Sequence, residues 1–188
     1  MRNRGFSLPE LMATLTIVAI ALAIGAPAMQ SFLKNNRVRS QIANLTSDIN
    51  LARSEAVRAK RRVILCRSAN PTAAAPSCGG SSNTWTTGWL IFASGDTNNT
   101  FQNSTDQLLR IRETVNATDL LVRTNSTSNQ NLEFNGDGST NEGGGTARFA
   151  VCDARGGDHG RQINVPPHGR MRIVKGSGSA PINCNSPV

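Results

Sequence analysis

The feature of this sequence that most restricts its fold is a long apolar segment close to the amino terminus. No charged residue lies between Glu10 and Lys34. As an α-helix, this segment is long enough to cross the roughly 30 Å hydrocarbon core of a bilayer. A short basic leader precedes it, and no small-residue cleavage site of the kind that ends a secretory signal follows Met29. The sequence therefore predicts a membrane helix that the mature protein keeps.

The residues at the start of this segment, Gly5-Phe6-Ser7-Leu8-Pro9-Glu10-Leu11, resemble the amino terminus of type IV prepilins. In that family a membrane-embedded prepilin peptidase cuts after the glycine and methylates the new amino terminus. The resemblance thus implies cleavage between Gly5 and Phe6, methylation of Phe6, and a role for Glu10 in assembly with other pilin subunits. An ionised carboxylate beside hydrocarbon is costly unless it is paired. The nearest cation is the new amino group of Phe6, in the same or a neighbouring subunit.

The apolar segment continues into an amphipathic pattern, which predicts a second half of the same helix. Its apolar residues recur in steps of four and three and so share one face; they are Val38, Ile42, Leu45, Ile49, Ala52 and Ala56. The other face carries the charged residues Arg37, Asp48, Arg53 and Arg58. We expect a leader over residues 1–5, a transmembrane helical segment over residues 6–33 and an amphipathic helical segment over residues 34–62.

Residues 63–188 are predicted to form one β-rich globular domain. Short runs of β-branched and aromatic residues alternate there with loops rich in Gly, Asn, Ser and Pro. Strands are expected at residues 62–67, 84–93, 108–115, 120–124, 132–134, 146–152, 161–165 and 171–175. Trp85 and Trp89 share one face at strand spacing and are expected in the core. The fold class is α+β, with a long amino-terminal helix packed on an antiparallel β-rich domain, which is also the fold of type IV pilins.

Four cysteines occur in the predicted domain, at Cys66, Cys78, Cys152 and Cys184. No C-x-x-C spacing is present, which disfavours a zinc site. In an exported chain an even number of cysteines is expected to form disulfides. Three pairings are possible, and the pairing that closes two local loops, Cys66–Cys78 with Cys152–Cys184, is favoured.

Three further blocks narrow the family resemblance. They are Gly88–Phe92, Leu132–Gly138 and Arg148–Cys152, and in this order they resemble the FimT/GspH branch of minor pilins and pseudopilins. The ordered set spans most of the chain.

The most specific candidate site is the stretch Gly169-Arg170-Met171-Arg172. The chain has a net charge of +8, and arginine greatly outnumbers lysine. Two arginines two positions apart on a strand project to the same side and present planar forks suited to phosphates. Four more basic residues near in sequence widen the predicted patch, namely Lys175, Arg161, Arg155 and Arg148. The GRxR stretch resembles one near the carboxyl end of FimT-like pilins that bind DNA during natural transformation.

This resemblance implies a minor pilin that binds extracellular DNA non-specifically. The chain contains few aromatic residues and no tyrosine, so a base-stacking platform is not expected. Contact with backbone phosphates predicts strong salt dependence instead. The preference for single- or double-stranded DNA stays open. The expected location is the bacterial inner membrane, crossed once, with a periplasmic domain that is extracellular in the pilus.

The alternative is a structural minor pilin or a type II secretion pseudopilin that primes filament assembly and binds other subunits but not DNA. An enzyme is not expected, because no G-x-S-x-G or phosphate-binding P-loop motif is present. The two histidines, His159 and His168, lie in loops rich in Gly and Pro. We predict no cofactor and no metal.

Overall fold

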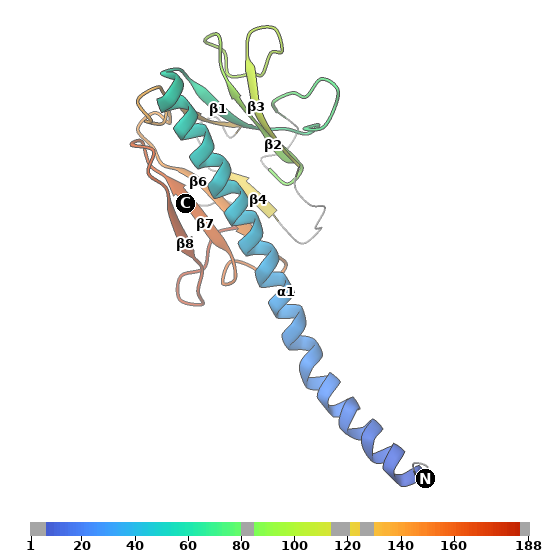
Figure 1. The fold of residues 1–188 in the computed structure, drawn as a ribbon. Helices are drawn as coiled ribbons and strands as arrows, with labels where there is room; N and C mark the ends of the chain where they lie inside the picture. The colour runs from blue at the N-terminus through green and yellow to red at the C-terminus, as the bar shows by residue number, and fades with distance from the viewer. Residues whose placement is uncertain (1–6, 80–84, 114–120, 125–129, 185–188) are drawn as a thin grey trace. The chain divides into compact units, whose positions relative to one another are not determined.

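The computed structural model describes residues 7–79, 85–113, 121–124 and 130–184 (Figure 1). Over these ranges the chain forms one long helix, α1 (Leu8–Ala59), followed by eight strands. The strands are β1 (Val63–Arg67), β2 (Gly88–Ala93), β3 (Gln107–Glu113), β4 (Leu121–Thr124), β5 (Asn131–Phe134), β6 (Ala147–Cys152), β7 (Arg161–Val165) and β8 (Arg172–Lys175). Residues 1–37 and 38–188 form separate compact units. The predicted cleavage and methylation positions, Gly5 and Phe6, lie outside the described residues.

The first unit contains the amino-terminal half of α1. Residues 7–33 are all exposed, although large apolar side chains predominate among them. By length and composition this part of the helix is suited to crossing a membrane. Apolar surface of this extent needs cover by lipid or by other apolar helices. Glu10 lies in the first turn of α1, where a carboxylate suits the positive end of the helix dipole.

In the second unit, α1 buries the face that the sequence pattern predicts. All six residues of the predicted stripe are buried, and none is more than 4% exposed. The helix ends at Ala59, three residues before the predicted boundary at residue 62. Lys60 has φ of 54°, a left-handed conformation that ends the helical hydrogen-bond pattern.

The strands form two antiparallel four-stranded sheets, which the carboxyl-terminal half of α1 covers (Figure 1). The first sheet has the order β3-β2-β1-β5 and the second has the order β4-β6-β7-β8. Alternate residues of the central strands point into one shared core with the α1 stripe; they include Leu65, Ile91, Phe149, Val151 and Ile163. The eight predicted strands are confirmed, with bounds that differ by a few residues. Trp85 and Trp89 are fully buried in this core, as predicted.

Two disulfides fasten loops to the sheets. Cys66 of β1 pairs with Cys78 in the following loop, and Cys152 at the end of β6 pairs with Cys184 in the carboxyl-terminal tail. This is the favoured one of the three pairings.

One expectation about α1 is wrong. Asp48, predicted on the outward face, is fully buried. Its carboxylate accepts hydrogen bonds from Trp89 Nε1 at 2.8 Å, Arg110 Nη1 at 2.7 Å and Arg112 Nε at 2.9 Å. Burial by itself raises the pKa of Asp48, but the hydrogen bonds from Arg112, Arg110 and Trp89 outweigh burial and hold the pKa below its ordinary value. These partners are distant in sequence, so helical periodicity gives no indication of them.

Candidate nucleic-acid interface

The predicted arginine motif lies where β7 turns into β8. Residues 166–171 connect these antiparallel strands, and the Gly169 N–H donates to the Pro166 carbonyl at 2.8 Å. Gly169 has φ of 73°, and a Cβ at this position would lie 2.1 Å from the Gly138 oxygen. A side chain there would be both strained and in collision. The glycine therefore allows the turn that places Arg170 at its end.

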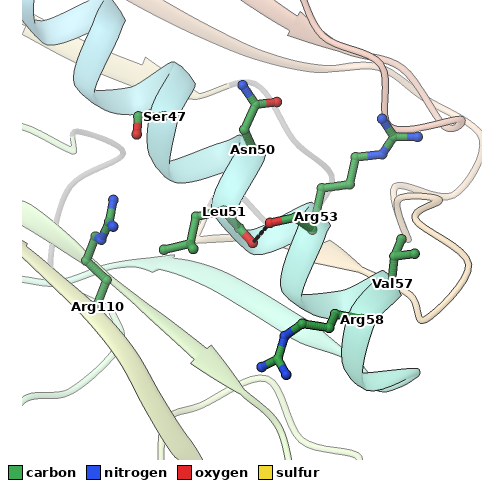
Figure 2. Close-up of a pocket in the computed structure, with 8 residues that line it drawn as sticks. Ser47, Asn50, Leu51, Arg53, Val57, Arg58 and Arg110 are labelled. Atoms are coloured by element: carbon green, nitrogen blue, oxygen red, sulfur yellow. Dashed lines mark hydrogen bonds between the residues drawn. The ribbon is translucent and has the colours of Figure 1, made fainter.

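Arg53 of α1 braces this turn. Its Nε donates to the Gly138 carbonyl at 3.1 Å, and its Nη2 donates to the His168 carbonyl at 3.3 Å. Figure 2 shows the Arg53 side chain leaving the helix toward these loops. The Thr140 N–H adds a bond of 2.7 Å to the Pro167 carbonyl. The turn is thus fixed from two directions, by the helix and by the glycine-rich loop that follows β5.

Arg170 and Arg172 are both exposed. The β8 strand forms an edge of the second sheet, and all four of its residues are exposed. Met171 packs against the core, so its two neighbours turn to the opposite side in an extended chain. Within the described part of the chain, neither guanidinium group has an ion pair or a hydrogen bond. The two arginines are therefore available to an external anion.

The sheet register brings Arg148 into the same row as Arg172. Asn164 of β7 pairs with Arg148 of β6 on one side and with Arg172 of β8 on the other. Residues directly opposite each other share a face. Ala147 and Phe149, which flank Arg148, point into the core, so this row faces away from α1. We call Arg148, Arg170 and Arg172 the outer arginines.

Arg161 and Lys175 lie on the other face of the sheet. They pair with each other across β7 and β8, in the same alternation as the core residue Ile163. Sequence proximity did not predict this division, because it depends on the register of the strands. The six predicted basic residues therefore do not form one continuous patch.

Unlike Arg170 and Arg172, Arg155 is not available to bind an external anion, because it forms an ion pair within the domain. Its Nη2 lies 2.5 Å from Asp153 Oδ2, and both side chains are largely buried. Burial by itself raises the pKa of Asp153, but hydrogen bonds from Arg155 outweigh it and hold the pKa below its ordinary value. The structure thus assigns Arg155 an internal partner.

Comparison with known proteins gives two family matches. A model of the type II transport protein GspH matches residues 41–169, and a model of the prokaryotic N-terminal methylation motif matches residues 1–26. The GspH match ends immediately before Arg170, so it carries no information about the two arginines that follow. No curated protein gives a significant match. The methylation motif and the apolar helix fit a pilin anchored in the inner membrane.

Two crystal structures of the Pseudomonas aeruginosa type IV minor pilin FimU are similar to this chain. The TM-scores are 0.57 and 0.54, each at 23% sequence identity. The alignments cover 81% and 78% of this chain and 98% of each FimU chain. At this identity the likeness shows a shared type IV pilin fold.

Proposed function

Since the chain belongs to the GspH family of pilins and pseudopilins and carries the N-terminal methylation motif, we propose that it is a minor pilin of a type IV pilus that holds extracellular DNA for natural transformation. The observation that carries the DNA-binding part is the exposure of Arg170, at the end of the turn, and of Arg172, at the start of the edge strand β8, with no ion pair to the described residues. A subunit that contacted other subunits through its helix would not need this arrangement.

The proposed contact is with backbone phosphates. Two guanidinium forks bind phosphate oxygens in the plane of the fork and do not read base edges. Arg148 and Asn164, both half-buried, extend the same outward surface, and the buried Gln162 donates from Nε2 to Asn164 Oδ1 at 2.6 Å. So few contacts per subunit predict weak, salt-sensitive and sequence-independent binding, which several subunits would strengthen through avidity.

The proposed life cycle follows from the amino terminus. A prepilin peptidase cuts between Gly5 and Phe6 and methylates Phe6, and Glu10 then directs entry into the filament. Before assembly the protein is anchored in the inner membrane with its domain in the periplasm. After assembly into the pilus this domain is extracellular. These steps rest on the motif that matches residues 1–26.

The test uses the full chain in a neutral detergent. We expect Arg170→Gln with Arg172→Gln to weaken DNA binding in a gel-shift assay by at least about tenfold, since each charge-assisted contact contributes about 1.5–3 kcal/mol. Transformation should fall in parallel. Arg58→Gln is the control, because Arg58 is highly exposed and already has an ion-pair partner, Glu55, on its own helix. Normal DNA retardation by the double variant would show that the proposed site is wrong.

The second candidate function is structural, as a minor pilin or pseudopilin that primes assembly without binding DNA. A groove of about 710 Å³ on the outward side of α1 favours it (Figure 2). Leu51 and Val57 present apolar surface there, which suits contact with another subunit. This function predicts that the double arginine variant assembles and transforms like the wild type.

A further inference from the structure

A cationic groove lies between α1 and the strands β7 and β8, on the face of the sheet opposite the outer arginines. No sequence motif predicted it. It has a volume of about 560 Å³. Arg39, Thr46 and Asn50 of α1 line one wall, and Arg161 of β7 and Ile173 of β8 line the other. All of these residues belong to the unit of residues 38–188.

The groove concentrates positive charge without a compensating carboxylate. Arg39 is exposed and Arg161 is half-buried. Lys175 does not line the groove but lies directly opposite Arg161 on the paired strand, an arrangement of like charges that destabilises a sheet. Among the described residues, no Asp or Glu lines the groove, and none forms an ion pair with these three cations. An anion bound between the cations would relieve their repulsion.

The groove also offers uncharged hydrogen-bonding groups. The hydroxyl oxygen of Thr46 is buried and has no hydrogen-bond partner in the described part of the chain. A buried polar atom of this kind normally has a partner. Ser47 and Asn50 are exposed beside it. Hydroxyl and amide groups next to arginines are a common setting for phosphate oxygens.

We propose that Arg39, Arg161 and Lys175 form a second phosphate-binding site, and that a nucleic-acid strand held by the outer arginines passes over the β8 edge into this groove. This inference rests on the proposed function. The two sites face opposite sides of one edge strand. A DNA duplex cannot bend around a single strand of a sheet, because its persistence length is about 50 nm. A flexible single strand can contact both sites, so the ligand of the complete path is single-stranded DNA.

The experiment measures binding of the full chain, in neutral detergent, to a labelled single-stranded oligonucleotide and to the matching duplex. Fluorescence anisotropy is recorded between about 50 and 200 mM NaCl. We expect Arg39→Gln and Arg161→Gln each to weaken single-strand binding several-fold and to reduce the salt slope by about 0.7 for each lost phosphate contact. Duplex binding should change little. Arg58→Gln, with the same change of charge on the same helix, should leave both ligands unaffected.

Three results separate this inference from the proposed function. If Arg39→Gln and Arg161→Gln bind single strands normally while Arg170→Gln with Arg172→Gln does not, the groove is not a site and the proposed function stands. If the groove variants weaken binding and the double variant does not, the proposed site is wrong. Equal losses on single-stranded and duplex DNA would overturn the path over the edge. Thermal unfolding of each variant checks that the domain is intact.

Discussion

The indole Nε1–H of Trp89 donates a hydrogen bond of 2.8 Å to the carboxylate of Asp48, inside the core of the domain. This bond joins β2 to α1. Arg110 and Arg112 reach the same carboxylate from β3, and Figure 2 shows Arg110 extending from its strand beside the helix. One side chain of the helix therefore fastens two strands of the first sheet.

Loss of the charge at Asp48 is expected to destabilise the domain. Asp48→Asn leaves two guanidinium groups without their counter-charge, and we expect a loss of about 3 kcal/mol in the free energy of unfolding. This is the lower end of the range for a buried pair, because the arginine side chains keep 37% and 30% exposure. Urea unfolding can be followed by tryptophan fluorescence, since both tryptophans are buried in this domain. Glu55→Gln, at an exposed helical ion pair, is the control and should not move the midpoint.

The Asp48 carboxylate is also expected to make the thermal stability of the domain depend on pH. Burial acts to raise the pKa of Asp48, yet the bonds from Arg112, Arg110 and Trp89 leave it below the ordinary value of 3.8. A group with a lowered pKa stabilises the fold above its unfolded pKa, and this contribution is lost as the pH falls toward the folded pKa. The thermal midpoint should be level above about pH 5 and fall below about pH 3.8. A decline of equal steepness in Asp48→Asn would assign the acid sensitivity to other groups, of which Asp153 is one candidate.

Arg53 is expected to support DNA binding by positioning the turn before Arg170. Arg53→Gln removes two bonds to the Gly138 and His168 carbonyls, so binding should weaken by less than in the double arginine variant. Amide hydrogen exchange in residues 166–169 should become faster. Arg53→Lys keeps the charge but loses the two-pronged geometry. Full rescue by lysine would mean that Arg53 acts through its charge and not by bracing the turn.

Gly169→Ala is expected to damage the same turn from within. The substitution forces a side chain into a left-handed conformation, with Cβ 2.1 Å from the Gly138 oxygen. We expect a loss of at least about 1 kcal/mol in unfolding free energy, together with weaker DNA binding. Gly178→Ala is the matched control, because no atom lies within 4 Å of a Cβ at that position. Equal melting temperatures for the two variants would contradict this view of the turn.

Glu10 is expected to be needed for assembly and not for membrane insertion. Glu10→Ala removes the carboxylate at the start of α1 and leaves the apolar helix unchanged. Membrane fractions should therefore contain the variant at the wild-type level, and sheared filaments should lack it. Recovery from filaments at the wild-type level would exclude the proposed pairing between Glu10 and the amino group of Phe6.

Local patterns predicted most of the architecture. The stripe from Val38 to Ala56 and the eight strands follow from the periods of a helix and of strands, which a single segment reveals. Asp48 was wrongly placed because its partners lie on β2 and β3, and only the assembled domain brings them to the helix. Helical periodicity assigns a polar residue to the outward face, but a charged residue can be buried when distant residues supply its partners.

The candidate site could be predicted only in part, because local spacing does not reveal which distant residues lie beside one another. Spacing alone predicted Arg170 and Arg172 on one side of a strand, and the structure has Arg172 in β8 and Arg170 in the turn before it. The row from Arg148 to Arg172 and the opposite position of Arg161 depend on strand register. Arg39 escaped notice because its place beside β8 depends on how the helix packs on the sheet. A basic residue next to the first residue of a buried stripe, as Arg39 is next to Val38, is too common in sequences to be informative.

The Cys152–Cys184 disulfide holds the carboxyl-terminal tail against the outward face of the second sheet, where a nucleic-acid ligand is proposed to bind. Ile182 and Cys184 pack on Ala150 and Cys152, which lie on the same outward face as Arg148. The carboxyl-terminal tail therefore closes that side of the sheet. A polymer bound as we propose would cross β6 only at Arg148, because the tail covers the outward positions Ala150 and Cys152 beyond it, so the covalent attachment of the tail limits how much of this face is open to a ligand.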